Sequence, residues 1–200
     1  MIRPPDWMEA ALRLLLDPVS IETVSGDLLE EYRESIYPKR GKRRADLWFL
    51  RQILGFAWRS SCGPILILAL LFAGRFVLDT FAPPADWGPR SAFTTWSAIA
   101  AYVAIGFWVA RKTRHVMTGT VIAVATHLIA HALNAAVALI LFFLVIRHDT
   151  EMQRLFYMTG GWGEMWELPL ILLPAVAVLG SIGGLAAPAV GYFIGRKNQG

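Results

Sequence analysis

Three polar side chains that could do chemistry, His127, His131 and Asn134, lie within a long apolar stretch of the sequence. Their i, i+4, i+7 spacing places them on one face of an α-helix. Ionisable side chains at membrane depth usually face the interior of a helix bundle or water. Three interpretations are open: hydrogen bonding between helices, a metal site formed by two histidines one turn apart, or a path for protons or a substrate.

The metal interpretation lacks the residues that normally accompany it. Position 128 is leucine, whereas the zinc motif H-E-x-x-H has glutamate there. His115 and His148 lie near the two ends of the same stretch, too far along a helix to join the pair. No other apolar stretch contains histidine, so a haem held by two histidines would need a second subunit.

A second pair of chemical groups, Arg75 and Asp79, is also spaced by one helical turn. We expect an ion pair, because either charge alone would be costly within a membrane. A pair that gates a substrate is the alternative. Glu164 and Glu167 lie where the last apolar stretch begins, and a helix dipole favours carboxylates at this end. We therefore predict that they cap this helix rather than act as catalytic acids.

Motifs of the common enzyme classes are absent from the sequence. It contains no nucleophile elbow, phosphate-binding loop or dinucleotide fingerprint. Cys62 is the single cysteine, which excludes an internal disulfide and any site built on a cysteine pair. We therefore expect a protein that is not an enzyme and that holds neither a cofactor nor a metal.

The distribution of charge divides the chain near residue 60. Residues 1–60 contain 10 of the 19 Lys and Arg residues and 9 of the 15 Asp and Glu residues. Residues 61–200 contain four hydrophobic stretches that approach or exceed the ~20 residues that span a bilayer. These stretches lie at about 62–82, 91–110, 117–146 and 167–195. The sequence thus predicts an all-α protein, with a three-helix cytoplasmic module before a four-helix transmembrane bundle.

Basic residues in the short connections predict the orientation of the chain. The connection at 111–115 carries three fixed positive charges and no acid, and Arg196 and Lys197 follow the last stretch. Short basic connections stay in the cytoplasm. Both termini are therefore expected inside, and the connections at 83–90 and 147–166 outside.

A basic cluster precedes the first hydrophobic stretch. Its members are Lys39, Arg40, Lys42, Arg43 and Arg44. Anionic headgroups attract such a cluster by about 1 kcal/mol per basic residue. Because the rest of the N-terminal segment is nearly neutral, we expect the cluster to contact the bilayer surface and not nucleic acid.

The N-terminal segment shows apolar residues at helical spacing in three runs, at about 7–16, 20–37 and 43–59. The third run could lie on the membrane surface. Gly26 falls within the second helix, and a close approach by the first helix would account for it. Breaks in the chain are predicted at Asp17–Pro18 and at Pro38 to Gly41. Gly63–Pro64 is expected to start the first span, because a proline is tolerated in a first helical turn.

Several short motifs in this segment resemble those of the permease prefix domain, the cytoplasmic module that precedes the first membrane helix of some bacterial macrolide-export-type ABC permeases. The motifs are P-P-x-W at 4–7, a leucine run within 13–16, D-P at 17–18, G-D-L-x-E-E-Y at 26–32, then Gly41, Ala45, Trp48-Phe49 and Gln52. The resemblance covers about residues 4–58. It implies a docking or regulatory module in a bacterial inner membrane protein. Those permeases also have a large extracytoplasmic domain and a duplicated core, for which this chain has no connection long enough.

Two further sets of residues point to contacts between surfaces. Asp27, Glu30, Glu31 and Tyr32 could form a partner surface on the module, or the acids could be a solvated helix face. Small residues recur at every fourth position of the last stretch, and such stripes let helices approach closely. The stripe consists of Gly183, Ala187, Gly191 and Gly195, with Gly180 and Gly184 beside it. Prolines 169, 174 and 188 add kinks that serve architecture or a hinge.

We therefore expect a non-enzymatic accessory protein of the bacterial inner membrane, whose prefix-like module docks or regulates a protein partner such as an ABC-type exporter. The alternative is a small transporter or channel that uses the polar face of the third span, with Arg75 and Asp79 as its gate and with the glycine stripe joining two copies.

Overall fold

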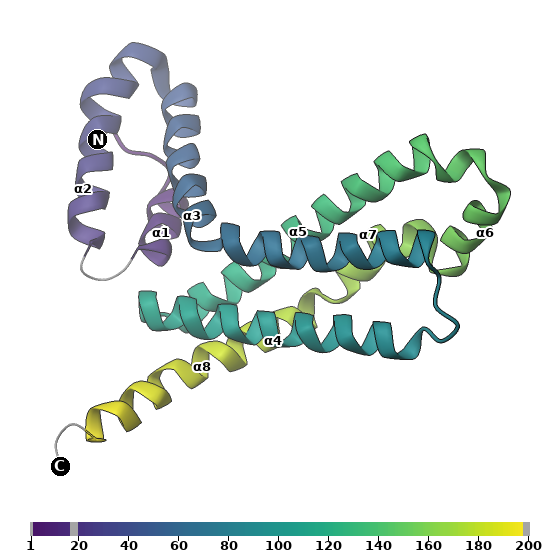
Figure 1. Ribbon diagram of the computed structural model, residues 1–200. Helices are drawn as coiled ribbons and strands as arrows, with labels where there is room; N and C mark the ends of the chain where they lie inside the picture. Colours follow the sequence, from purple (N-terminus) through teal and green to yellow (C-terminus); the bar gives the residue numbers. More distant parts are fainter. Residues whose placement is uncertain (1, 17–19, 198–200) are drawn as a thin grey trace.

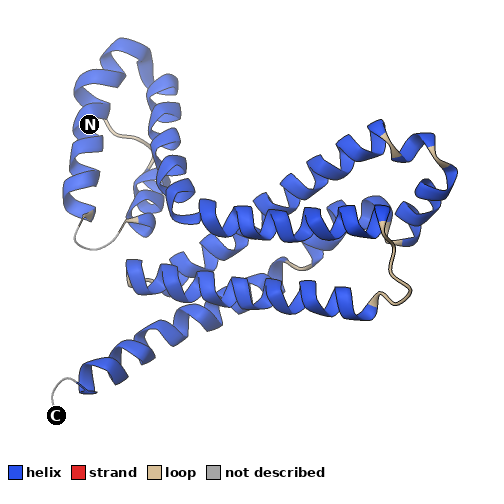
Figure 2. Ribbon diagram, in the orientation of Figure 1, coloured by secondary structure: helices blue, strands red, loops and turns tan. Residues whose placement is uncertain are grey.

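The described chain is entirely helical. The computed structural model describes residues 2–16 and 20–197, and these ranges contain no strand (Figure 2). The all-α fold class is therefore confirmed, whereas the predicted break at Asp17–Pro18 lies outside the described residues. The elements are α1 (Asp6–Leu15), α2 (Ile21–Glu31), a π-helical turn η1 (Tyr32–Ile36), α3 (Tyr37–Phe81), α4 (Gly88–Thr113), α5 (Val116–Leu144), a 3₁₀ turn η2 (Ile146–His148), α6 (Thr150–Met158), α7 (Gly161–Ile171) and α8 (Leu173–Lys197).

The first helices and the beginning of α3 enclose a small hydrophobic core, here called the module core. Its buried side chains are Met8, Leu12, Leu16, Tyr32, Ala45, Phe49 and Ile53. Tyr32 is 0% exposed, and its hydroxyl donates a hydrogen bond of 2.6 Å to Oδ1 of Asp46. Burial, and after it the hydrogen bond to Asp46, raises the pKa of Tyr32. The prediction of Tyr32 as part of a partner surface is therefore wrong, because its side chain faces the core.

Gly26 is not a contact between helices. A Cβ built on this residue would meet no described atom within 4 Å, and the residue is exposed. The expectation that a close approach by α1 accounts for this glycine is wrong, since its surroundings leave room for a side chain.

The predicted third helix and first span are one continuous element, α3. The break predicted near Pro38–Gly41 is reduced to a kink at Gly41, whose φ of 70° and ψ of 168° are not helical. Pro64 lies inside α3, and the candidate span within this helix begins at Ser61, close to the start predicted at Gly63–Pro64. A proline ring clashes with the carbonyl four residues earlier, which favours a bend rather than an end. Figure 1 shows α3 turning between the module and the long helices.

The long helices have the length and composition of membrane spans. Ser61–Phe81, Gly88–Thr113 and Val116–His148 each qualify alone. Thr150–Ile171 and Leu173–Pro188 qualify together as a pair bent by 47°, so the continuous fourth helix predicted at 167–195 is interrupted. Large apolar side chains such as Leu70, Trp108 and Leu144 are exposed along these helices, as expected of a surface that faces lipid. The chain is therefore interpreted as a membrane protein.

Glycines bring α4, α5 and α8 into backbone contact. A Cβ on Gly106 would collide with the carbonyl of Gly180, and a Cβ on Gly183 would collide with the carbonyl of Val103. Gly119 of α5 lies against the backbone of Gly106. Gly106 and Gly119 were not identified from the sequence. The stripe at Gly183 thus packs against α4 of the same chain, which occupies the surface that a second copy would need.

The other members of the predicted stripe have different positions. Ala187 is buried. Gly191 and Gly195 belong to the helical backbone of α8, but their surroundings lie outside the part of the chain whose side chains are described.

We predict that Gly183→Ala destabilises the protein, because a single methyl group would displace the backbone of α4. Overpacking of this kind costs about 1–3 kcal/mol. Gly74→Ala is the matched control, since Gly74 lies on an exposed face of α3 with no described atom within 4 Å of a built Cβ. The measurement is the thermal unfolding midpoint of both variants in the same detergent. Equal midpoints would contradict the close packing of α8 on α4.

Candidate functional site

A cavity of about 290 Å³ lies between the long helices and brings the two predicted polar clusters together. Arg75 and Asp79 line it from α3, and His127, His131 and Asn134 line it from α5. Side chains of α4, α7 and α8 complete its walls, which are mainly apolar. Residues that the sequence separates by about fifty positions therefore share one site.

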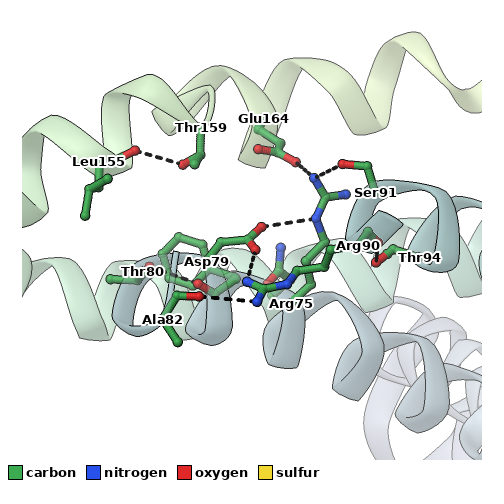
Figure 3. A network of polar contacts seen from close by, with 12 residues as sticks. Arg75, Asp79, Thr80, Ala82, Arg90, Ser91, Thr94, Leu155, Thr159 and Glu164 are labelled. Atoms are coloured by element: carbon green, nitrogen blue, oxygen red, sulfur yellow. Dashed lines mark hydrogen bonds and ion pairs between the residues drawn. The ribbon is translucent and has the colours of Figure 1, made fainter. Parts of the chain in front are cut away.

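One end of the cavity is closed by an ionic network around Asp79. Asp79 is 6% exposed, and its carboxylate accepts hydrogen bonds from Nε of Arg75 at 3.2 Å and from Nη1 of Arg90 at 2.6 Å. Nη2 of Arg75 also lies 3.6 Å from Oε1 of Glu164 and 3.3 Å from Oγ of Ser91. Figure 3 shows Asp79 between the two arginines, with Glu164 above Arg75. Two positive and two negative charges thus meet at this end.

The network corrects one prediction and extends another. Glu164 does lie in the first turn of α7, but its side chain reaches across to Arg75 of α3, so its role is not confined to capping. Glu167 is exposed on the same helix. The sequence predicts Arg90 at the end of the connection at 83–90. In the structure Arg90 lies in the first turn of α4 and pairs with Asp79. The short connection at 83–87 could have signalled this, because it keeps the ends of α3 and α4 close.

His127 is fully hydrogen-bonded between three helices. Its Nε2 lies 2.9 Å from the carbonyl oxygen of Pro169, and its Nδ1 lies 2.7 Å from the hydroxyl of Tyr102. A carbonyl only accepts, so Nε2 carries the proton and Nδ1 accepts from Tyr102. This neutral tautomer leaves no nitrogen for a metal. These contacts support the first of the three interpretations for His127, in which it forms hydrogen bonds between helices.

His131 and Asn134 differ from His127, because each keeps a buried polar atom without a partner. Nδ1 of His131 and Oδ1 of Asn134 form no hydrogen bond in the described structure. The His131 ring stacks on Phe72, with centroids 4.3 Å apart, and lies 4.5 Å from the His127 ring. Most buried polar atoms in proteins are satisfied, so two such atoms in one cavity mark a place where something can bind.

The polar side chains described around the cavity are not arranged to hold a metal ion. Within residues 2–16 and 20–197, no group of three or more His, Cys, Asp and Glu side chains is arranged to hold a metal ion. The carboxylates at the ionic end are paired with arginines, and the Tyr102 hydroxyl beside His127 donates its hydrogen bond to Nδ1 of that ring. The arrangement can bind and orient a molecule, with an apolar wall, a charge-balanced end and two unsatisfied polar atoms.

The charged residues predicted on the module lie away from this cavity. Asp27, Glu30 and Glu31 are exposed, and none of them forms an ion pair in the described structure. The basic cluster is exposed at the beginning of α3, around the kink at Gly41, at the tip of the module (Figure 1). About 18 residues of helix separate Lys42 from Ser60, or about 27 Å at 1.5 Å per residue. The cluster is thus near the membrane in sequence but distant from the first span along the helix.

We predict that Asp79→Asn destabilises the protein by about 3 kcal/mol, because it leaves two arginines without their shared carboxylate at membrane depth. Glu151→Gln is the control. It removes an exposed pair with Arg154 at 3.9 Å, and such pairs contribute less than about 1 kcal/mol. The measurement is the unfolding free energy of both variants in mixed micelles. If Asp79→Asn lowers the unfolding free energy no more than Glu151→Gln does, the ionic network does not stabilise the fold.

Comparison with known proteins gives no relative from which the site could be interpreted. No protein-family model, curated protein or solved structure matches this chain. The function must therefore be argued from the chain's own residues and their geometry.

Proposed function

We propose that the chain is a non-enzymatic accessory protein of a bacterial inner membrane, whose module of residues 1–60 docks a protein partner in the cytoplasm. The resemblance to a permease prefix domain indicates an ABC-type exporter or its regulator as the partner. In this proposal α3, α4, α5 and the bent pair of α7 and α8 form four spans.

The observation that carries this proposal is the firm attachment of the module to the membrane helices. Oγ1 of Thr118, at the start of α5, donates a hydrogen bond of 2.8 Å to the carbonyl of Leu14 in α1. Leu15 packs against both the module core and the core of the long helices. A partner bound to the module would therefore act on α5, the helix that carries His131 and Asn134.

The acidic side chains of α2 supply a surface on which a partner could dock. Figure 1 shows α2 on the side of the module away from the long helices. Asp27, Glu30 and Glu31 are exposed and unpaired there in the described structure. A basic partner surface would complement them, and charges of this kind chiefly raise the rate and specificity of association.

The outer face of α3 has the character of a helix that lies on a bilayer. Leu47, Leu54 and Trp58 are exposed and fall on the face opposite the buried Phe49, with Arg51 among them. In Figure 1 this part of α3 runs across the direction of the long helices, as a helix lying along the membrane surface would. We infer that α3 rests on the cytoplasmic leaflet, which keeps the distant basic cluster at headgroup level.

We predict that the variant Asp27→Asn/Glu30→Gln/Glu31→Gln loses co-purifying partners in mild detergent, because it removes three negative charges without changing side-chain shape. The control Asp86→Asn/Glu151→Gln/Glu167→Gln removes the same charge from exposed positions in the membrane half of the chain. Neutralisation is preferable to deletion of residues 1–58, which would cut α3 and remove the partner of Thr118. An unchanged set of partners in the first variant would remove the docking proposal.

The proposed orientation has its own test. Reporter fusions after Lys42, Arg114 and Lys197 are expected to report cytoplasm, and fusions at Asp86 and Thr150 the outside, because basic connections stay inside. The fusion at Asp86 is the most informative, because it tests whether the first span crosses the bilayer although Arg75 and Asp79 interrupt its apolar part. If that fusion reports cytoplasm, α3 does not cross the bilayer and the four-span arrangement is wrong.

A further inference from the structure

The unsatisfied atoms of the cavity specify what it can bind. Asn134 is 6% exposed, lines the cavity, and has an Oδ1 without a hydrogen-bond partner in the described structure. Its Nδ2 donates to Sδ of Met165 at 3.3 Å. A thioether sulfur only accepts, so this contact fixes the orientation of the amide. The atom left unpartnered is therefore the carbonyl oxygen, which requires a donor.

His131 adds a second polar contact on the same face, three residues before Asn134. Its ring lines the cavity and stacks on Phe72, and its Nδ1 is buried without a partner in the described structure. A hydroxyl group can donate one hydrogen bond and accept another. It therefore matches a carbonyl oxygen and an imidazole nitrogen together, whereas a carbonyl group, which only accepts, cannot pair with Oδ1 of Asn134.

The charges that line the cavity argue against an ionic ligand. Arg75 and Asp79 line it and are paired with each other, and Arg75 also lies beside Glu164. Arg90 supplies the second positive charge on Asp79. Two arginines thus balance two carboxylates, and an added ion at membrane depth would have no uncompensated charge to meet. A neutral ligand is favoured.

The walls and the opening point to a molecule that dissolves in the bilayer. Phe76, Ala98 and Val176 are among the buried apolar side chains of the lining. The exposed lining residues come from α4 and from the region of the bend between α7 and α8. They are Thr95, Leu168, Leu172 and Ala175. An opening between these helices faces lipid in the proposed arrangement.

We propose that this cavity binds a small neutral molecule with an apolar body and one hydroxyl group, an alcohol or a phenol, that enters from the bilayer. Its hydroxyl donates to Oδ1 of Asn134 and contacts Nδ1 of His131, while its apolar body fills the space between Phe72 and Val176. The proposal does not depend on partner docking, and it requires no transport.

The test uses 2-naphthol, a fluorescent phenol that is neutral at neutral pH, with the full-length protein in detergent micelles. Its matched control ligand is 2-methylnaphthalene, which has a methyl group in place of the hydroxyl. Binding is measured by equilibrium dialysis against empty micelles. We expect saturable binding of one 2-naphthol per protein, and about tenfold weaker binding of 2-methylnaphthalene, since a buried carbonyl then stays unpaired.

Asn134→Leu removes the acceptor and keeps the side-chain size. This substitution should weaken the binding of 2-naphthol by about tenfold and leave the binding of 2-methylnaphthalene unchanged. Ala175→Phe at the opening should prevent binding of both probes, whereas Val178→Phe on an exposed face of the same helix outside the cavity should not. Ala175→Phe keeps the proposal testable if Asn134→Leu fails to fold.

Three results would overturn the proposal. The first is uptake of both probes in proportion to detergent, without saturation. The second is equal 2-naphthol affinity in Asn134→Leu and the unmodified protein. The third is equal binding by Ala175→Phe and Val178→Phe. Loss of partners in the acidic-face variant with probe binding intact would separate this site from the docking surface.

Discussion

The bend between α7 and α8 is the constraint on which the arrangement of the membrane helices depends. Pro174 has no N–H and lies in the first turn of α8, the position where a proline costs a helix least, and α7 ends before it. The last carbonyls of a helix have no partner within it, and an unpaired carbonyl is costly in apolar surroundings. His127 supplies the missing donor to Pro169. The same ring then holds the Tyr102 hydroxyl, so one backbone interruption joins α4, α5 and α7.

The cavity follows from the difference between the two ends of these helices. Near the 111–115 connection, Gly106, Gly119 and Gly180 allow the backbones of α4, α5 and α8 to touch. Toward the other end the 47° bend carries α7 away from the line of α8. The ionic network around Asp79 holds α3, α4 and α7 together there. The cavity is the space that remains between the glycine contacts at one end and the ionic network at the other.

Sequence patterns predicted the features that depend on local spacing. The approximate spans, the shared face of His127, His131 and Asn134, and the pairing of Arg75 with Asp79 all follow from helical periodicity. Tyr32 could also have been placed correctly, because it continues the apolar spacing of Val24 and Leu28. The prediction that Tyr32 lies on a surface did not use that pattern. The π-helical turn that begins at Tyr32 also changes the spacing of side chains around the helix, which no sequence rule predicts.

The remaining features depend on contacts between distant parts of the chain. Periodicity does not determine which carbonyl meets His127, or that Glu164 reaches Arg75 across 89 positions of sequence. A charge cluster gives no sign of which way its helix turns, so the distance along α3 between the basic residues at 39–44 and the first span does not follow from the sequence. The continuity of α3 through Pro64 was missed for a similar reason, since a proline permits both a bend and a break.

Two attachments relate the module to the cavity. The first is α3 itself, whose beginning packs in the module core and whose end contributes Phe72 and Asp79 to the cavity. The second is the bond from Thr118 to Leu14, which joins the module to α5. Coupling between sites requires a contiguous set of packed elements with more than one arrangement. The turn that α3 makes between the module and the long helices is a position where one helix can change direction while both its ends stay packed (Figure 1). A displacement of the module would therefore reach the cavity through α3 and α5 at once, and these two helices form adjacent walls of the site, where Phe72 stacks on His131.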